Sequence, residues 1–128
     1  MRAYISRRTL LSCLKGAENV YPGEFLGLLR GIVEPRGVVV KELVLAPLAE
    51  YEETHSSFSP WLVPTDPSII GSFHSHPAPA PGGLRPSKAD LHFFSRNGKI
   101  HLIACLPYSP EAVAAYDREG KKAELRVE

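Results

Sequence analysis

The sequence GSFHSHP at residues 71–77, followed by RPSKADL at residues 85–91, is the most informative part of this chain. The segment Ile69–His74, which overlaps the first stretch, predicts a strand. The Pro-Ser pair in the second stretch is typical of a helix start, so we expect a helix over Lys88–Arg96. The proline- and glycine-rich segment Pro77–Pro86 between them predicts a loop with no regular structure.

The remaining segments predict a second helix and several further strands. Apolar residues recur at helical spacing behind a capping serine, Ser6, so a helix is expected from about Arg7 to Asn19. Strands are expected at Tyr4–Ile5, Glu24–Ile32, Val38–Leu45, around Ser56–Phe58 within the otherwise irregular stretch Ala46–Pro67, and at Lys99–Leu106, Ala112–Tyr116 and Ala123–Val127. Turn residues join the second strand to the third, and the last two strands to each other, as hairpins. This order predicts a single α+β domain over residues 1–128, on a mixed or antiparallel sheet.

Length and composition exclude several classes of protein. The chain has 128 residues, 44% hydrophobic and 23% charged, as in ordinary globular domains. Fifteen basic residues balance fourteen acidic ones, which argues against binding to nucleic acid or to a membrane surface. No apolar run approaches the roughly 18 residues of a membrane span, and the N-terminus predicts no signal peptide. Cys13 and Cys105 are expected to be buried thiols in a reducing cytoplasm.

The two histidines His74 and His76 point to metal chemistry. Residues i and i+2 of an extended chain face the same side with Cα atoms roughly 6.5–7 Å apart. Both imidazoles can therefore bind one ion at about 2.0–2.1 Å. Asp90, in the first turn of the expected helix, can supply a third, oxygen ligand. Two histidines and a carboxylate form a catalytic zinc set that leaves a fourth position for water, whose pKa zinc lowers to about 7.

A water with such a lowered pKa also needs a proton acceptor that is not a metal ligand. Glu24 is the first candidate for this acceptor, and Glu42 is the next. Glu24 stands at the start of an apolar strand, so its carboxylate enters the fold at a strand end. Ser87, one turn before Asp90, can donate a hydrogen bond to the oxyanion that develops on a scissile carbonyl. Simpler explanations remain open: Ser87 and Asp90 also fit an ordinary helix N-terminus, and Glu24 also fits a solvated turn.

Together these residues resemble the signature of the JAMM (MPN+) metalloprotease family, H-S-H-P followed by S-x-x-D. The segment PGEFLGLL at residues 22–29 resembles the family's glutamate-bearing segment, and HLIACLPY at 101–108 resembles the strand after its zinc-site helix. The resemblance covers nearly the whole chain, whose length is similar to that of small stand-alone archaeal members. The spacer 77–86 departs from the pattern, with ten residues where the family usually has seven. We expect this longer loop to affect substrate contacts more than the zinc site.

The resemblance implies a curved mixed β-sheet flanked by helices, similar to the cytidine deaminase fold. It also implies a zinc-dependent isopeptidase that cleaves after the C-terminal glycine of ubiquitin or a ubiquitin-like modifier. His74, His76 and Asp90 would bind one zinc ion per chain. Glu24 would act as general base and then as general acid to the leaving amine, and Ser87 would steady the tetrahedral intermediate. The partners would be conjugates of a ubiquitin-like or sulfur-carrier protein, with no nucleic acid and no membrane.

Substrate binding is expected in the segment before the histidine strand, where relatives offer the modifier's extended tail a sheet edge. This segment holds the only dense acidic cluster of the sequence, Glu50, Glu52 and Glu53. We expect one or two of these carboxylates to pair with a basic residue of the tail, and a solvated charged loop is the alternative. Trp61 either lines the substrate groove or is a local apolar anchor.

Other catalytic classes lack their signatures here. The sequence has no G-x-S-x-G motif of serine hydrolases, no P-C-x-x-C motif of nucleoside deaminases and no H-E-x-x-H motif of zincins. Two alternatives to the isopeptidase stay open. The first is an amidohydrolase that frees a ubiquitin-like sulfur-carrier protein from a C-terminal adduct, in sulfur transfer or cysteine biosynthesis. The second is a non-catalytic MPN scaffold, against which the complete ligand set argues. His101, on an alternating strand, is expected to be packed or at the surface.

Overall fold

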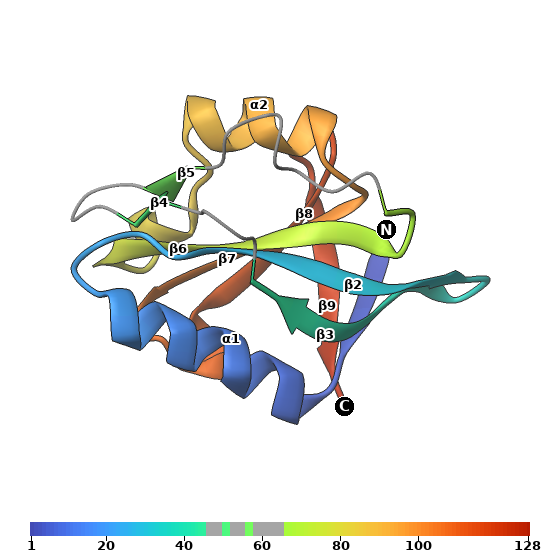
Figure 1. The fold of residues 1–128 in the computed structure, drawn as a ribbon, viewed down its shortest axis with the longest axis horizontal. Helices are drawn as coiled ribbons and strands as arrows, with labels where there is room; N and C mark the ends of the chain where they lie inside the picture. Colours follow the sequence, from blue (N-terminus) through green and yellow to red (C-terminus); the bar gives the residue numbers. More distant parts are fainter. Residues whose placement is uncertain (46–49, 52–55, 58–65) are drawn as a thin grey trace.

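The computed structural model describes residues 1–45, 50–51, 56–57 and 66–128. Within these residues, a mixed sheet closes on itself in the strand order β1-β3-β2-β6-β7-β8-β9, and β9 pairs with β1. The helix α1 (Arg7–Val20) lies on one side of this sheet and α2 (Lys88–Arg96) on the other (Figure 1). The fold is therefore α+β, with a curved mixed sheet flanked by helices, as the sequence predicts.

The strands lie close to the segments predicted along the chain. The strands of the sheet are β1 (Arg2–Ile5), β2 (Leu26–Glu34), β3 (Gly37–Val44), β6 (Ile69–Pro79), β7 (Ile100–Leu106), β8 (Val113–Asp117) and β9 (Lys122–Val127). β1 runs parallel to both β3 and β9, and β6 runs parallel to β7, while the other pairs are antiparallel. Both predicted hairpins, β2–β3 and β8–β9, are confirmed. Two short strands, β4 (Glu50–Tyr51) and β5 (Ser56–Ser57), pair with each other apart from the sheet.

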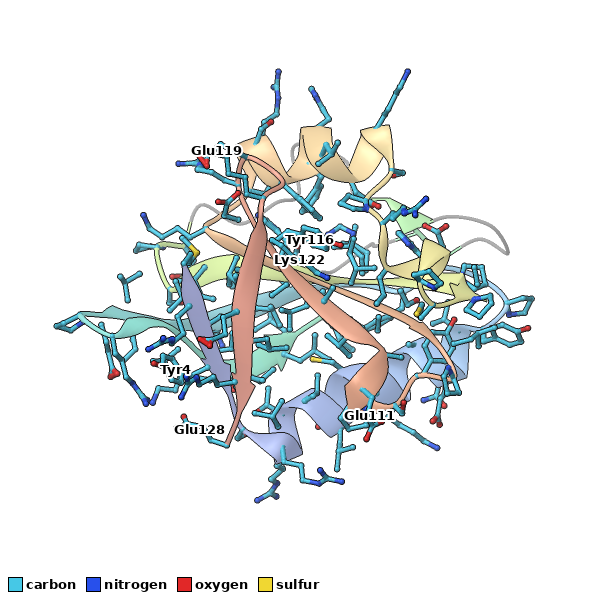
Figure 2. All side chains as sticks on the ribbon, turned by 180° about the vertical axis from the view of Figure 1, so that it is seen from behind. Tyr4, Glu111, Tyr116, Glu119, Lys122 and Glu128 are labelled. Carbon is cyan, nitrogen blue, oxygen red and sulfur yellow. The ribbon has the colours of Figure 1, made fainter. Side chains whose placement is uncertain are left out.

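Apolar side chains fill both sides of the sheet. The face of α1 that carries Leu10, Cys13, Leu14 and Ala17 is buried in the larger cluster, where Phe73 of β6 also lies. Phe94 of α2 packs with a smaller cluster that includes Tyr116 of β8, which Figure 2 labels below that helix. Both cysteines are free and buried, as expected, and burial raises the pKa of the Cys13 thiol to about 12. In the described part of the chain, no helix is long and apolar enough to cross a membrane.

The prediction that Pro77–Pro86 has no regular structure is wrong in two places. Strand β6 continues through Pro79, and Gly82–Leu84 forms one turn of 3-10 helix, η2. The pairing of β6 with β7 shifts register between His76 and Pro79. Such an irregularity lets prolines, which lack an N–H donor, remain within a strand. The loop is thereby fastened to the end of the sheet beside the two histidines.

Candidate metal centre and active site

The histidine motif lies on the side of β6 that faces α2. The His74 ring makes edge contacts with Phe93 and Phe94 of that helix, with ring centroids 5.3 and 5.4 Å apart. Phe73, one residue earlier, belongs to the core on the α1 side. This alternation follows from the two-residue period of a strand, and it turns both predicted ligands toward the start of α2.

The N-terminus of α2 brings the carboxylate of Asp90 to these histidines. The Ser87 hydroxyl accepts from the Asp90 backbone N–H at 3.0 Å, and the Asp90 carboxylate accepts from the Ser87 N–H at 2.8 Å, a reciprocal capping box. The same carboxylate lies 3.0 Å from His76 Nε2 and 3.6 Å from His74 Nδ1. The helix-cap explanation and the ligand explanation of Asp90 are thus compatible.

The spacing of these donor atoms suits a tetrahedral cation. Two ligands that each lie 2.0–2.1 Å from such an ion are about 3.3 Å apart, and the two observed separations, 3.0 and 3.6 Å, fall on either side of that value. The described residues nevertheless contain no group of three His, Cys, Asp or Glu side chains that already converges as a complete set of ligands. Asp90 is hydrogen-bonded to His76 and lies near His74, and the three side chains have the donor chemistry of a zinc site.

The pKa values of the triad are set by burial and by the ion pair. Burial lowers the pKa of His74 to about 4, so this imidazole is neutral near pH 7. Burial alone would raise the pKa of Asp90, but the hydrogen bond with His76 and the other neighbours outweigh it and lower that pKa to about 2. Burial also opposes protonation of His76, yet Asp90 and the other neighbours outweigh it and raise the His76 pKa. A cation at this site would take the place of the His76 proton.

Glu24 lies next to the triad, in the segment before β2. The backbone of the following residue, Phe25, is bonded to Ser75 of β6 in two ways: its N–H donates to the Ser75 hydroxyl at 2.7 Å, and its carbonyl accepts from the Ser75 N–H at 2.9 Å. Ser75 stands between the two histidines. The half-buried Glu24 carboxylate is close enough for its charge to help raise the pKa of His76. The structure therefore brings the predicted base to the predicted ligands.

The longer loop, expected to affect substrate contacts more than the zinc site, also takes part in the geometry of the predicted metal site. The carbonyl of Gly83 in η2 lies 2.9 Å from His76 Nδ1. The hydroxyl of Tyr116 donates to the Leu84 carbonyl at 2.6 Å and holds the loop against β8. A ligand histidine usually donates its second ring N–H to a group of this kind, which fixes the ring orientation.

Other predicted residues lie elsewhere or outside the described part of the chain. Glu42, the second candidate base, pairs with Arg30 on an exposed part of the β2–β3 hairpin. Glu52, Glu53 and Trp61 lie outside the described residues, and Glu50 is described only as part of β4. The predicted pairing of this acidic cluster with a substrate tail stays a prediction.

Three residues beside the predicted ligands were not predicted from the sequence. Gly83 carries no local signal, because its contribution is a backbone carbonyl. Ser72 could have been found, because it precedes His74 by two residues and so shares its side of the strand. His101 is fully buried beside Ser72, which agrees with the expectation that it is packed. The parallel pairing of β6 with β7 brings the two residues together, and this pairing cannot be predicted from the sequence of either segment.

Comparisons with known proteins identify the family of this chain. Residues 6–119 match the family described as prokaryotic homologs of the JAB domain. A protein of Haloferax volcanii named "Probable metalloprotease" is 36% identical over 120 residues, which cover 89% of this chain and 72% of that protein.

Solved structures share the whole fold. A JAB1/MPN domain protein from Archaeoglobus fulgidus superposes with a TM-score of 0.72 at 35% identity and covers 97% of both chains. A structure described as "JAMM: A Metalloprotease-like Zinc Site in the Proteasome and Signalosome" gives a TM-score of 0.71 at 32% identity, covering 100% of this chain and 99% of that one. On these matches and on its HSHP and SxxD motifs, this chain belongs to the JAB (JAMM/MPN) metalloprotease-like family of prokaryotes.

Proposed function

We propose that this protein is a zinc-dependent isopeptidase, which hydrolyses the bond after the C-terminal glycine of a ubiquitin-like modifier. The main observation behind the proposal is that the Asp90 carboxylate lies beside both His74 and His76. The charge of Glu24 also helps to raise the pKa of the same His76. Family membership supports hydrolysis of an amide bond, and the relative named as a probable metalloprotease supports the same class of reaction.

His74, His76 and Asp90 would hold one zinc ion. That ion would supply Lewis acidity, which polarises a carbonyl and makes water acidic near neutral pH. Glu24 takes a proton from the attacking water on its carboxylate and passes it to the leaving amine. The Ser87 hydroxyl oxygen accepts from the Asp90 N–H, which leaves the hydroxyl proton for the oxyanion that develops on the scissile carbonyl.

Cleavage of defined conjugates tests this function. The zinc-loaded chain is incubated with three substrates of one ubiquitin-like protein: an isopeptide conjugate on lysine, a linear C-terminal fusion and a C-terminal cysteine adduct. The products are identified by mass spectrometry, with and without a zinc chelator. We expect release of the modifier with a free glycine carboxylate, and no release with chelator. Cleavage of the cysteine adduct alone would favour the sulfur-carrier amidohydrolase, and cleavage of none would contradict the proposal.

Metal content provides the matching control. Elemental analysis should find about one zinc per wild-type chain and far less in His76→Ala, because zinc sites in proteins normally use at least three protein ligands. The same variant should lose activity. Equal zinc content in the two proteins would remove His76 from the ligand set.

A further inference from the structure

Two buried residues behind His74 have no role in the function proposed above. Ser72 of β6 lies with its hydroxyl oxygen 2.7 Å from His74 Nε2 and 2.6 Å from His101 Nδ1. Ser72 and His101 are both fully buried, and His74 is 7% exposed. The three side chains form a continuous hydrogen-bonded row that runs from His74, whose Nδ1 lies 3.6 Å from the Asp90 carboxylate, into the protein interior.

Aromatic packing fixes both ends of this row. The ring of Phe94 stacks on His101 with centroids 4.4 Å apart and planes 8° apart, and its edge meets His74 at 5.4 Å. Burial, with a smaller effect of His74, lowers the pKa of His101 to about 3, so this ring is neutral and carries one proton. Among the described residues, its Nε2 is the buried side-chain nitrogen or oxygen without a hydrogen-bond partner. Burial of a polar group without a hydrogen-bond partner costs free energy, so this buried row calls for a function.

We propose that Ser72 and His101 are positioning residues for the metal ligand His74: they hold its ring with Nδ1 toward Asp90 and with the proton on Nε2. This inference rests on the proposed zinc site. Histidine ligands depend on such partners, because the group bonded to the second ring nitrogen fixes both the tautomer and the ring orientation. Here a serine, itself oriented by a second histidine, takes the place of the usual carboxylate or carbonyl.

When His74 binds a cation, the protons along this row of hydrogen bonds can be arranged in one way. Nδ1 must then offer its lone pair, so Nε2 carries the proton and donates to the Ser72 oxygen. The single hydroxyl proton of Ser72 in turn donates to His101 Nδ1. The proton of His101 is therefore on Nε2, the atom at the buried end of the row. The backbone of Gly98 and of Phe94 lies near this ring and acts to raise its pKa against the larger effect of burial, although neither makes a hydrogen bond with Nε2.

Zinc affinity, measured by competition with a chromogenic chelator, tests the role of Ser72 without any substrate. Ser72→Ala should weaken zinc binding by roughly 10- to 100-fold, the usual effect of losing a partner of a metal ligand. Ser72→Thr keeps the hydroxyl and should recover most of the affinity. Cys13→Ala is the matched control, because it trims an equally buried side chain that lies on α1, on the other side of the sheet. Its zinc affinity should stay close to that of the wild type.

His101 is tested by a second pair of variants. His101→Phe keeps a ring against Phe94 but removes the acceptor, so it should weaken zinc binding as Ser72→Ala does. His101→Asn offers an amide oxygen near the position of Nδ1 and should recover part of the loss. Thermal unfolding of each variant separates a loss of zinc affinity from a loss of fold.

The histidine tautomers of the zinc-loaded wild type give a readout that needs no variant. Two-bond nitrogen–proton NMR spectra should find His74 and His101 each protonated on Nε2. A proton on His101 Nδ1 would overturn the proposal. So would wild-type zinc affinity in Ser72→Ala, or an equal loss in Cys13→Ala. Wild-type zinc affinity in His74→Ala would instead overturn the zinc site itself, so the two failures are distinguishable.

Discussion

The carbonyl oxygen of Gly83 lies 2.9 Å from Nδ1 of His76. A side chain at residue 83 would not fit there, since an added Cβ would lie 2.4 Å from the Ala78 carbonyl oxygen and 2.6 Å from the Cys105 Cβ. The glycine thus allows the loop to approach the strand closely enough for its carbonyl to reach the histidine. The segment in which this chain departs from the family's spacing is therefore part of what orients a predicted ligand.

Gly83→Ala should weaken zinc binding by roughly tenfold or more, because the carbonyl must move away from His76. It should also destabilise the fold by about 1–3 kcal/mol, since the new methyl group meets backbone and a buried cysteine. Gly82→Ala is the matched control, because a Cβ at that position meets nothing within 4 Å. Chelator competition and thermal unfolding measure the two effects. Equal zinc affinity in both variants would contradict an orienting role for the Gly83 carbonyl.

The helices and the triad could be predicted from the sequence because local signals specify them. The expected helix Arg7–Asn19 is observed as Arg7–Val20, and the expected Lys88–Arg96 is observed unchanged. A serine cap begins each helix, and α1 ends before Pro22. His74 and His76 could be assigned to one site because the two-residue period of a strand places both on the same side.

The features that could not be predicted depend on pairing between distant segments. The parallel register of β6 with β7 places Ser72 opposite His101, and the contact of β1 with β9 closes the sheet. Neither follows from hydrophobic pattern, because the pattern gives the face of a strand but not its neighbour. Pro77 and Pro79 indicated a loop. The register shift that keeps them in the strand could not be predicted, because it also depends on the neighbouring strand.

Glu24→Gln should keep zinc and fold but lower kcat by roughly 10²- to 10⁴-fold, the usual contribution of a general base. Glutamine has nearly the shape of glutamate and cannot take the proton. Glu42→Gln is the control, because Glu42 pairs with Arg30 on an exposed surface and its loss should leave activity nearly unchanged. Zinc analysis and single-turnover cleavage check both variants. A Glu24→Gln enzyme that cleaves at the wild-type rate would exclude Glu24 as the base.

Ser87 has two expected roles, and substitutions separate them. Ser87→Ala loses the helix cap and should lower the stability of the fold by about 1 kcal/mol, whereas Ser87→Gly should lower it by only a few tenths of a kcal/mol. Both lose the hydroxyl, so both should lower kcat if this group steadies the oxyanion. Ser87→Thr retains cap and hydroxyl and should recover activity. Thermal unfolding and steady-state kinetics would distinguish the roles; full activity in Ser87→Gly would reduce Ser87 to a helix cap.

The acidic cluster can be tested in solution although two of its members lie outside the described residues. Combined Glu50→Gln, Glu52→Gln and Glu53→Gln substitutions should raise KM several-fold on a substrate with a basic tail and leave kcat nearly unchanged, because exposed ion pairs contribute only about 0.2–1 kcal/mol each. The effect should shrink at high salt, which screens exposed charges. An unchanged KM at low salt would favour the solvated loop instead.

The buried histidines predict how the stability of the metal-free protein depends on pH. Burial lowers the folded-state pKa of His74 to about 4 and that of His101 to about 3, both below the unfolded value of about 6.5. As the pH falls, the unfolded chain therefore takes up protons before the folded chain does. Their contribution to stability is fully present above about pH 6.5 and is lost as the pH falls toward the folded values. His76, with its raised pKa, acts in the opposite sense over the same range.

Between pH 7 and pH 5 the metal-free chain should lose a few kcal/mol of stability, because two lowered histidines outweigh one raised histidine while most carboxylates stay ionised. Thermal unfolding in the presence of chelator measures the loss. His101→Phe cannot bind the extra proton in either state, so its melting temperature should fall less over this range than that of the wild type. Equal falls in the two proteins would mean that His101 titrates alike in the folded and unfolded chains, contrary to its burial beneath Phe94.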